Sequence, residues 1–168
     1  MVLGIEDLRQ HFQAAGLSGA SVCIHASIKS LGPLTHGPET VIQSALLEEM
    51  TVLVPTQSWK HFSAPKPTDR AYIELNAEND GSIPLEMPKN QGFSTDSIVV
   101  GSAMGILPRI LLEKFPKVRG NHPLASFSAT GPRAEFLIST QTADKPFAPI
   151  EQLIADKGKI LLLGTDLT

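Results

Sequence analysis

The sequence predicts an α/β fold: a three-layer α/β/α sandwich with a largely parallel central sheet. Two observations carry this prediction. Short apolar runs typical of strands, at Ala20–Ile24, Thr51–Val54 and Lys159–Leu163, alternate along the chain with segments of helical periodicity. The runs VCI, TVLV and ILLL are continuously apolar, as expected of strands that are buried on both faces by helices.

The segments between these strands carry helix signals, and each has its own boundary markers. Gly16 follows the first predicted helix as a C-terminal cap, and Pro38 suits the first turn of the second. Pro108 should either kink the third helix or mark its true first turn. The predicted helices are Ile5–Ala15, Glu39–Glu49, Ser102–Phe115, Gly131–Ile138 and Pro149–Asp156, and Leu124–Ala129 is a further strand.

The segment Gln57–Ser97 is unlike the rest of the chain. It contains several prolines and little periodicity, and a loop of this length inside a compact domain is unusual and often functional. Two interpretations are open, a substrate lid or a mobile loop.

Composition limits the class of protein. The chain has 168 residues, of which 42% are apolar and 18% charged, which suits one globular domain. A net charge of −3 without a basic cluster argues against a nucleic-acid partner. The single cysteine, Cys23, excludes a disulfide framework and is expected to be a buried small hydrophobe. Since no signal peptide or membrane-spanning stretch is evident, we expect a cytoplasmic protein without a membrane partner.

The loop His25–Gly32 is the first candidate site. It follows the first predicted strand, and in open α/β sheets the carboxyl ends of the strands are where ligands bind. Its backbone N–H groups, hydroxyls and lysine suit an amide or phosphate group of a cofactor. A turn that is capped without any ligand would have the same sequence features, so both readings stand at this point.

The second candidate is the segment Arg119–Ser126, in which a cation and an imidazole precede a strand. Arg119 has the geometry for bidentate phosphate contacts, and His122 could act as a base. The alternative is an exposed arginine and a histidine that stabilises a turn. His11, His36 and His61 are expected to be solvated, as are Glu48 and Glu49 at a helix end, and the histidine spacing offers no metal site.

Several of these segments resemble the aminoglycoside 3-N-acetyltransferase family, the YokD-like antibiotic acetyltransferases. The family's (I/V)H(A/S)S(L/I)xSxG loop reads IHASIKSLG here, and its Pxx(V/A)xRSxHPxxSFxAxG segment reads PKVRGNHPLASFSATG. The family's SPxxxL element reads APIEQL, and its (I/L)LL(L/I)G strand reads ILLLG. The order and spacing of these motifs match almost end to end, over what corresponds to the N-terminal two-thirds of the family.

The resemblance implies an acetyl-CoA-dependent N-acetyltransferase, with acetyl-CoA as co-substrate and no metal. The acceptor would be a small-molecule amine, namely the 3-amino group of an aminoglycoside antibiotic, and a homo-oligomer is conceivable. The implied coenzyme-binding residues are His25, Ala26, Ser27, Ile28, Ser30, Leu31, Gly32 and Arg119.

The chain also departs from the family pattern. The family's NTxxHxxE element, which holds the expected catalytic histidine and glutamate, would fall beyond Thr168, so residues 1–168 would form an incomplete domain that lacks the C-terminal part. The family's Arg-Ser pair is Arg119-Gly120 here, and its Phe-Asp-Pro is Phe93-Ser94-Thr95. His122 is then the remaining catalytic candidate. Two alternatives follow: a non-catalytic CoA-binding module, or a fragment that binds nothing.

Overall fold

The computed structural model describes residues 2–58 and 93–165. Most of the predicted long loop Gln57–Ser97 therefore lies outside the described residues, and so does His61. The helices are α1 Ile5–Ala14, α2 Ile28–Leu31, α3 Glu39–Leu47, α5 Ile106–Lys114, α6 Ala134–Ile138 and α7 Ala148–Ala155, with a 3₁₀ turn η3 at Ser102–Met104. The strands are β1 Ser21–Ala26, β2 Thr51–Pro55, β3 Val118–Arg119, β4 Phe127–Thr130 and β5 Lys159–Leu163.

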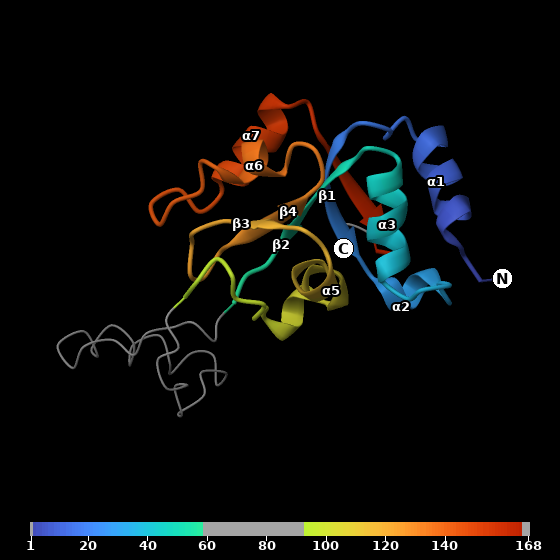
Figure 1. The fold of residues 1–168 in the computed structure, drawn as a ribbon, viewed down its shortest axis with the longest axis horizontal. Helices are drawn as coiled ribbons and strands as arrows, with labels where there is room; N and C mark the ends of the chain where they lie inside the picture. Colours follow the sequence, from blue (N-terminus) through green and yellow to red (C-terminus); the bar gives the residue numbers. More distant parts are fainter. Residues whose placement is uncertain (1, 59–92, 166–168) are drawn as a thin grey trace.

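The strands form a five-stranded sheet in the order β3-β4-β2-β1-β5. β1 pairs in parallel with both β2 and β5, whereas β4 runs antiparallel to β2 and to β3. The predicted α/β class is confirmed, and the sheet is mixed because β4 runs against its neighbours. Figure 1 shows α1 and α3 on one side of the sheet and α6 and α7 on the other.

Side-chain alternation along the central strands builds the three layers. Val22, Ile24, Val52 and Val54 face the core formed with α1, α3 and α5. Cys23 and Leu53, which point to the opposite face, belong to the core formed with α6 and α7. The apolar runs in β1 and β2 are therefore buried on both faces, as the sequence predicts.

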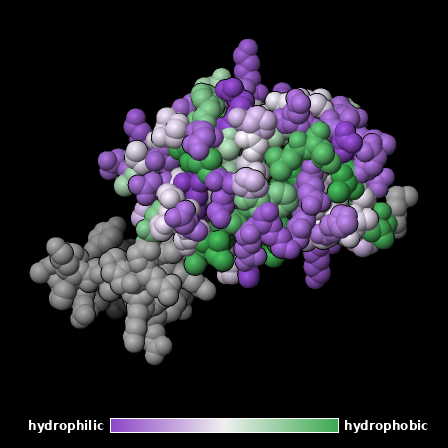
Figure 2. All heavy atoms as spheres, viewed as in Figure 1, coloured by the Kyte–Doolittle hydropathy of each residue, from purple (hydrophilic) through white to green (hydrophobic). Residues whose placement is uncertain are grey.

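The third apolar run is an exception. β5 is an edge strand in the described part of the sheet, and Ile160 on it is 66% exposed. The expectation that ILLL is buried on both faces was wrong, because burial of an outer strand depends on a neighbour that its own sequence does not specify. On the face of the molecule seen in Figure 2, apolar side chains form small groups among hydrophilic ones.

One helix prediction and one strand prediction also need correction. The predicted single helix Ser102–Phe115 is divided into η3 and α5, because Gly105 between them has a positive φ of 77°. Pro108 lies in the first turn of α5, where its missing N–H is tolerated. The strand predicted at Leu124–Ala129 begins at Phe127, and the two-residue strand β3 was not predicted.

Glu48 was expected to be a solvated residue at the end of a helix, and the structure shows that this was wrong. Its side chain is buried and accepts hydrogen bonds from Arg9 Nε at 2.8 Å, Gln13 Nε2 at 2.9 Å and Ser18 Oγ at 2.7 Å. These three donors come from α1 and the turn after it, so Glu48 ties α3 to α1. His11 and His36 are exposed, as expected.

Candidate functional site

A cavity of about 470 Å³ lies at the carboxyl ends of β1 and β2. Its walls come from these strand ends, the η3–α5 segment, the start of β4 and the start of α7. The lining residues are Cys23, Ile24, His25, Ala26, Ser27, Pro55, Gln57, Ala103, Met104, Leu107, Pro108, Phe127, Phe147, Ile150 and Thr165. The position agrees with the general rule for ligand sites in open α/β sheets.

The loop after β1 forms one wall of this cavity. His25, Ala26 and Ser27 line it directly. Ser27 N donates to Leu163 O at 2.8 Å, and the Ser27 and Ser30 hydroxyls lie 2.8 Å apart. The end of β5 therefore fixes the position of the loop.

Gly164 is required for this contact between β5 and the loop. Its φ is 64°, and a Cβ at this position would lie 2.8 Å from Ser27 O. A side chain at residue 164 would push the loop away from the strand. The small residue thus sets the backbone position of a cavity wall.

The remaining predicted loop residues lie outside the cavity lining. Ile28 and Leu31 are partly buried against the core on the α1, α3 and α5 side, so they hold the α2 turn on the sheet. Ser30 and Gly32 are exposed. The structure thus brings three residues of the loop, His25–Ser27, to the cavity, and a coenzyme contact by any part of the loop stays a prediction.

Cys23 lines the cavity beside His25, with Cys23 Sγ and His25 Nε2 separated by 3.8 Å. Burial raises the pKa of the Cys23 thiol to about 11, so the group is an uncharged thiol at neutral pH. The expectation of a buried cysteine is confirmed, since the residue is 1% exposed. The exposed His25 is thereby the polar group that β1 presents at this end.

Arg119 lies away from the cavity lining, and its guanidinium is used within the protein. Nη2 donates to Thr56 O and Val99 O, both at 2.9 Å, and Nη1 donates to Ser97 O. Nε donates to Ser126 Oγ at 3.2 Å. Burial lowers the pKa of Arg119 to about 10, which leaves it charged at neutral pH.

These contacts give Arg119 a structural task. It joins the residues after β2, the 97–99 segment and the loop before β4. The Phe93 ring also lies 5.3 Å from its guanidinium carbon. A coenzyme contact by Arg119 stays a prediction.

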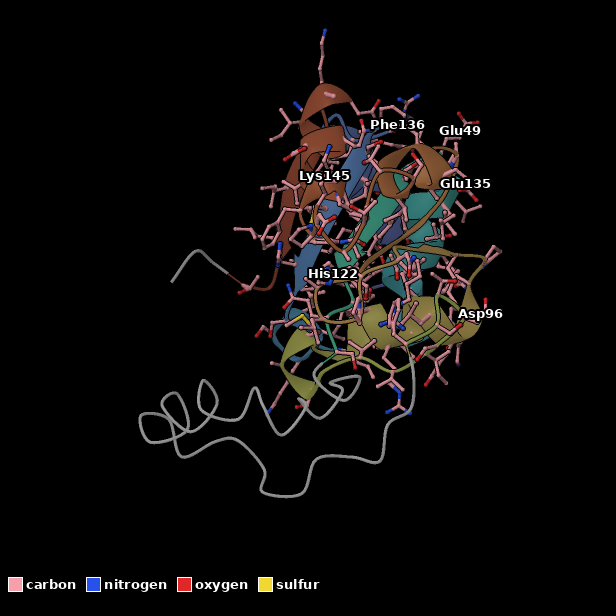
Figure 3. The ribbon with its side chains drawn as sticks, turned by 90° about the vertical axis from the view of Figure 1, so that its left-hand side faces the viewer. Glu49, Asp96, His122, Glu135, Phe136 and Lys145 are labelled. Carbon is pink, nitrogen blue, oxygen red and sulfur yellow. The ribbon has the colours of Figure 1, made fainter. Side chains whose placement is uncertain are left out.

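His122 lies in the loop between β3 and β4 (Figure 3). Its Nδ1 accepts hydrogen bonds from Leu124 N at 3.2 Å and Ala125 N at 2.9 Å. An atom that accepts two N–H groups carries no proton, so the neutral ring holds its proton on Nε2. In this arrangement His122 is a hydrogen-bond donor through Nε2, and a catalytic role stays a prediction.

Sequence reasoning missed the aromatic wall of the cavity. Phe127 and Phe147 form an edge-to-face pair with ring centroids 6.5 Å apart, and both line the cavity. Neither phenylalanine was predicted as a site residue, and Phe147 is 59% exposed. The one feature in the sequence that could have marked Phe147 is its position at the start of a helix that contains Pro149. Among the described residues, no group of three His, Cys, Asp or Glu side chains could hold a metal ion.

Comparison with known proteins identifies the family. A family model described as aminoglycoside 3-N-acetyltransferase matches residues 23–168. The chain belongs to this family. It is 31% identical over 156 residues to aminoglycoside N(3)-acetyltransferase IX of Micromonospora chalcea, an alignment that covers 89% of the chain and 52% of the relative. The chain thus spans about half the length of that acetyltransferase.

Solved structures of aminoglycoside acetyltransferases have the same fold. The aminoglycoside acetyltransferase AAC(3)-IIb superposes with a TM-score of 0.76 at 25% identity, over 99% of this chain and 60% of that protein. A binary complex of AAC-IIIb with CoASH superposes with a TM-score of 0.74 at 22% identity, over 96% of this chain and 59% of that protein. The second likeness bears on the fold alone. Within the described residues, no helix is long and apolar enough to cross a membrane.

Proposed function

We propose that this chain forms the coenzyme side of an acetyl-CoA-dependent N-acetyltransferase. The acceptor is the 3-amino group of an aminoglycoside or a similar amine. The observation that carries the proposal is the cavity at the end of β1, walled by a loop whose sequence matches the family and whose position Gly164 fixes. Family membership and the CoASH complex of AAC-IIIb support the choice of coenzyme.

The cavity residues suit a ligand that has both amide and apolar groups. His25 and Ser27 supply polar atoms on one wall, while Phe127 and Ile150 supply an apolar surface on another. Bound acetyl-CoA would supply the acetyl thioester. The amine acceptor must lose a proton before it attacks, because only the neutral amine is nucleophilic.

The base that takes this proton is proposed in the family's histidine and glutamate element, which the resemblance places beyond Thr168. Among the described residues, His122 is the candidate for an active-site role other than this base. Because its Nδ1 accepts two backbone N–H groups, it would serve through the Nε2 proton, as a donor to a ligand oxygen. The same proposal places the protein in the cytoplasm, where a free buried thiol such as Cys23 stays reduced.

Thermal melting with and without acetyl-CoA tests the proposal. A ligand that binds only the folded chain, at 100 times its Kd, adds about 2.7 kcal/mol to the free energy of unfolding. We expect a clear rise in the melting midpoint for the wild-type chain and a smaller rise for His25→Ala. The matched control is His11→Ala, since His11 is exposed on α1 and lies outside the cavity.

A cooperative melt without any shift contradicts coenzyme binding by this chain. If acetyl-CoA binds, release of the CoA thiol in the presence of an aminoglycoside panel separates an enzyme from a non-catalytic module. Binding without thiol release favours the non-catalytic CoA-binding module.

A further inference from the structure

Phe147 has an unusual position for a large apolar side chain. It is 59% exposed, yet its ring lines the cavity. The ring pairs edge-to-face with that of Phe127, at an interplanar angle of 70°. An exposed phenyl ring gains little from folding, because most of its surface remains in water. A ligand in the cavity would cover this surface, so the ring is better suited to binding than to stability.

A buried amide holds the segment that carries this ring. Gln141 is 4% exposed, and its Nε2 donates to Ala125 O at 2.9 Å and to Pro146 O at 2.5 Å. Its Oε1 accepts from Phe127 N at 3.1 Å. One side chain thus closes the turn between residues 141 and 146 and joins it to the start of β4. Both cavity phenylalanines are next to backbone groups that this amide binds.

Gly120 makes room for the amide. A Cβ at residue 120 would lie 1.6 Å from Gln141 Oε1 and 2.6 Å from Gln141 Cδ. Any larger residue at this position would force the Gln141 side chain out of its place. The sequence showed Gly120 as a departure from the family's Arg-Ser pair, and the structure supplies a physical reason for it.

We propose that Phe147 is a ligand-contacting residue that packs against the apolar part of the pantetheine arm of CoA, and that Gln141 and Gly120 are its positioning residues. This inference rests on the proposed function. The cavity lining combines the apolar side chains of Phe127, Phe147 and Ile150 with the polar atoms of His25 and Ser27. A chain that alternates methylene and amide groups, as pantetheine does, matches both kinds of lining.

The test compares CoA with 3′,5′-ADP, which has no pantetheine arm, by calorimetric titration. Phe147→Ala should weaken CoA binding about tenfold and leave 3′,5′-ADP binding unchanged, since a tenfold change corresponds to about 1.4 kcal/mol of apolar contact. Phe136→Ala is the matched control: Phe136 is 38% exposed on α6, packs on Arg133 and lies outside the cavity lining. It is labelled at the upper end of Figure 3, away from His122. This control should bind both probes as the wild type does.

The outcomes separate the two proposals. If the wild-type chain does not bind CoA, both the proposed function and this inference are overturned. If the wild type binds and Phe147→Ala binds CoA equally well, the inference alone is overturned. A parallel loss of 3′,5′-ADP binding would place the ring against the nucleotide and overturn the pantetheine contact.

The positioning residues are tested in the same titration. Gly120→Ala should reduce CoA affinity as Phe147→Ala does, because the displaced Gln141 amide no longer holds the turn before Phe147. The effects of Gly120→Ala and Gln141→Ala on the free energy of unfolding should be less than additive in the double variant, since both remove the same hydrogen bonds. Additive effects, or unchanged CoA affinity in Gly120→Ala, would overturn the positioning role.

Discussion

Glu48 and Arg119 are both charged and both almost fully buried, but their partners differ in kind. Glu48 is 7% exposed and meets a cation, an amide and a hydroxyl, from Arg9, Gln13 and Ser18. Arg119 is 4% exposed and meets backbone carbonyls and the hydroxyl of Ser126. Among the described residues, Glu48 is balanced by an opposite charge, whereas Arg119 is held by neutral dipoles and the Phe93 ring.

This difference shows how each charge serves the fold. The Glu48 cluster ties two helices through side chains, so one missing donor leaves others in place. Arg119 donates to the carbonyl of Thr56, just after β2, and to the carbonyl of Val99. Without the guanidinium the Val99 carbonyl would lose the donor described here, and the Thr56 carbonyl would keep only the Ser126 hydroxyl, which donates to it at 3.0 Å. A buried acceptor left unsatisfied costs about 1–3 kcal/mol. We therefore expect Arg119 to matter more for stability.

The largest effect is expected for Arg119→Met, which keeps much of the side-chain volume and removes every donor. The free energy of unfolding should fall by about 3–5 kcal/mol, because the carbonyls of Thr56, Ser97 and Val99 lose their charge-assisted hydrogen bonds from Arg119. Urea unfolding followed by circular dichroism measures the loss. Arg109→Met is the matched control, since Arg109 is exposed and its ion pair among the described residues is with Glu113. Equal stability of the two variants would contradict a structural role for Arg119.

The sequence alone predicted one of these two residues as a coenzyme ligand and the other as a solvated charge. Residue type shows that an arginine can bind phosphate, but the carbonyls of Thr56, Ser97 and Val99 are equally good acceptors, and only the fold decides between them. Glu48 finds its donors 30 to 39 positions away in the sequence. A contact of that range leaves no local pattern, so a helix-end glutamate reads as exposed.

The fold was more predictable than the site for the same reason. The strands β1 and β2 have apolar runs that local pattern reveals, and Gly16 and Pro38 mark helix boundaries by their own backbone limits. The two-residue β3 is too short to show a period. The roles of Phe147 and Gln141 depend on segments brought together by the sheet. The His25–Gly32 loop was found because it follows a recognisable strand.

A middle-sized effect is expected for Glu48→Gln, and it should depend on pH. The hydrogen bond from Ser18, followed by those from Arg9 and Gln13, holds the pKa of Glu48 below its ordinary value of 4.5. A lowered pKa means that the ionised carboxylate stabilises the folded chain above pH 4.5 and that this stability is lost as pH falls through the folded-state pKa. The wild type should therefore be more stable than Glu48→Gln at neutral pH, and the difference should shrink in acid.

Urea unfolding of both proteins from neutral to acid pH measures this difference. Glu49→Gln is the matched control, because Glu49 is the next residue and is exposed. It should show no comparable pH-dependent difference from the wild type. A difference between the wild type and Glu48→Gln that stays constant with pH would mean that the carboxylate charge is not what stabilises the cluster.

The smallest loss of stability is expected for Arg9→Met, and its dependence on salt concentration tests the comparison with Arg119. Arg9 Nε binds Glu48 Oε1 at 2.8 Å and Nη1 binds Glu6 Oε2 at 2.9 Å, but its side chain is 30% exposed and Glu48 would keep Gln13 and Ser18. The free energy of unfolding should fall by less than in Glu48→Gln. This loss should become smaller still in about 1 M NaCl, since salt screens exposed ion pairs. The loss of stability in Arg119→Met should be the same with and without added salt, because the described hydrogen-bond partners of Arg119 are neutral. If both losses respond to salt alike, the contrast between a charge-paired and a dipole-paired buried residue does not hold for this protein.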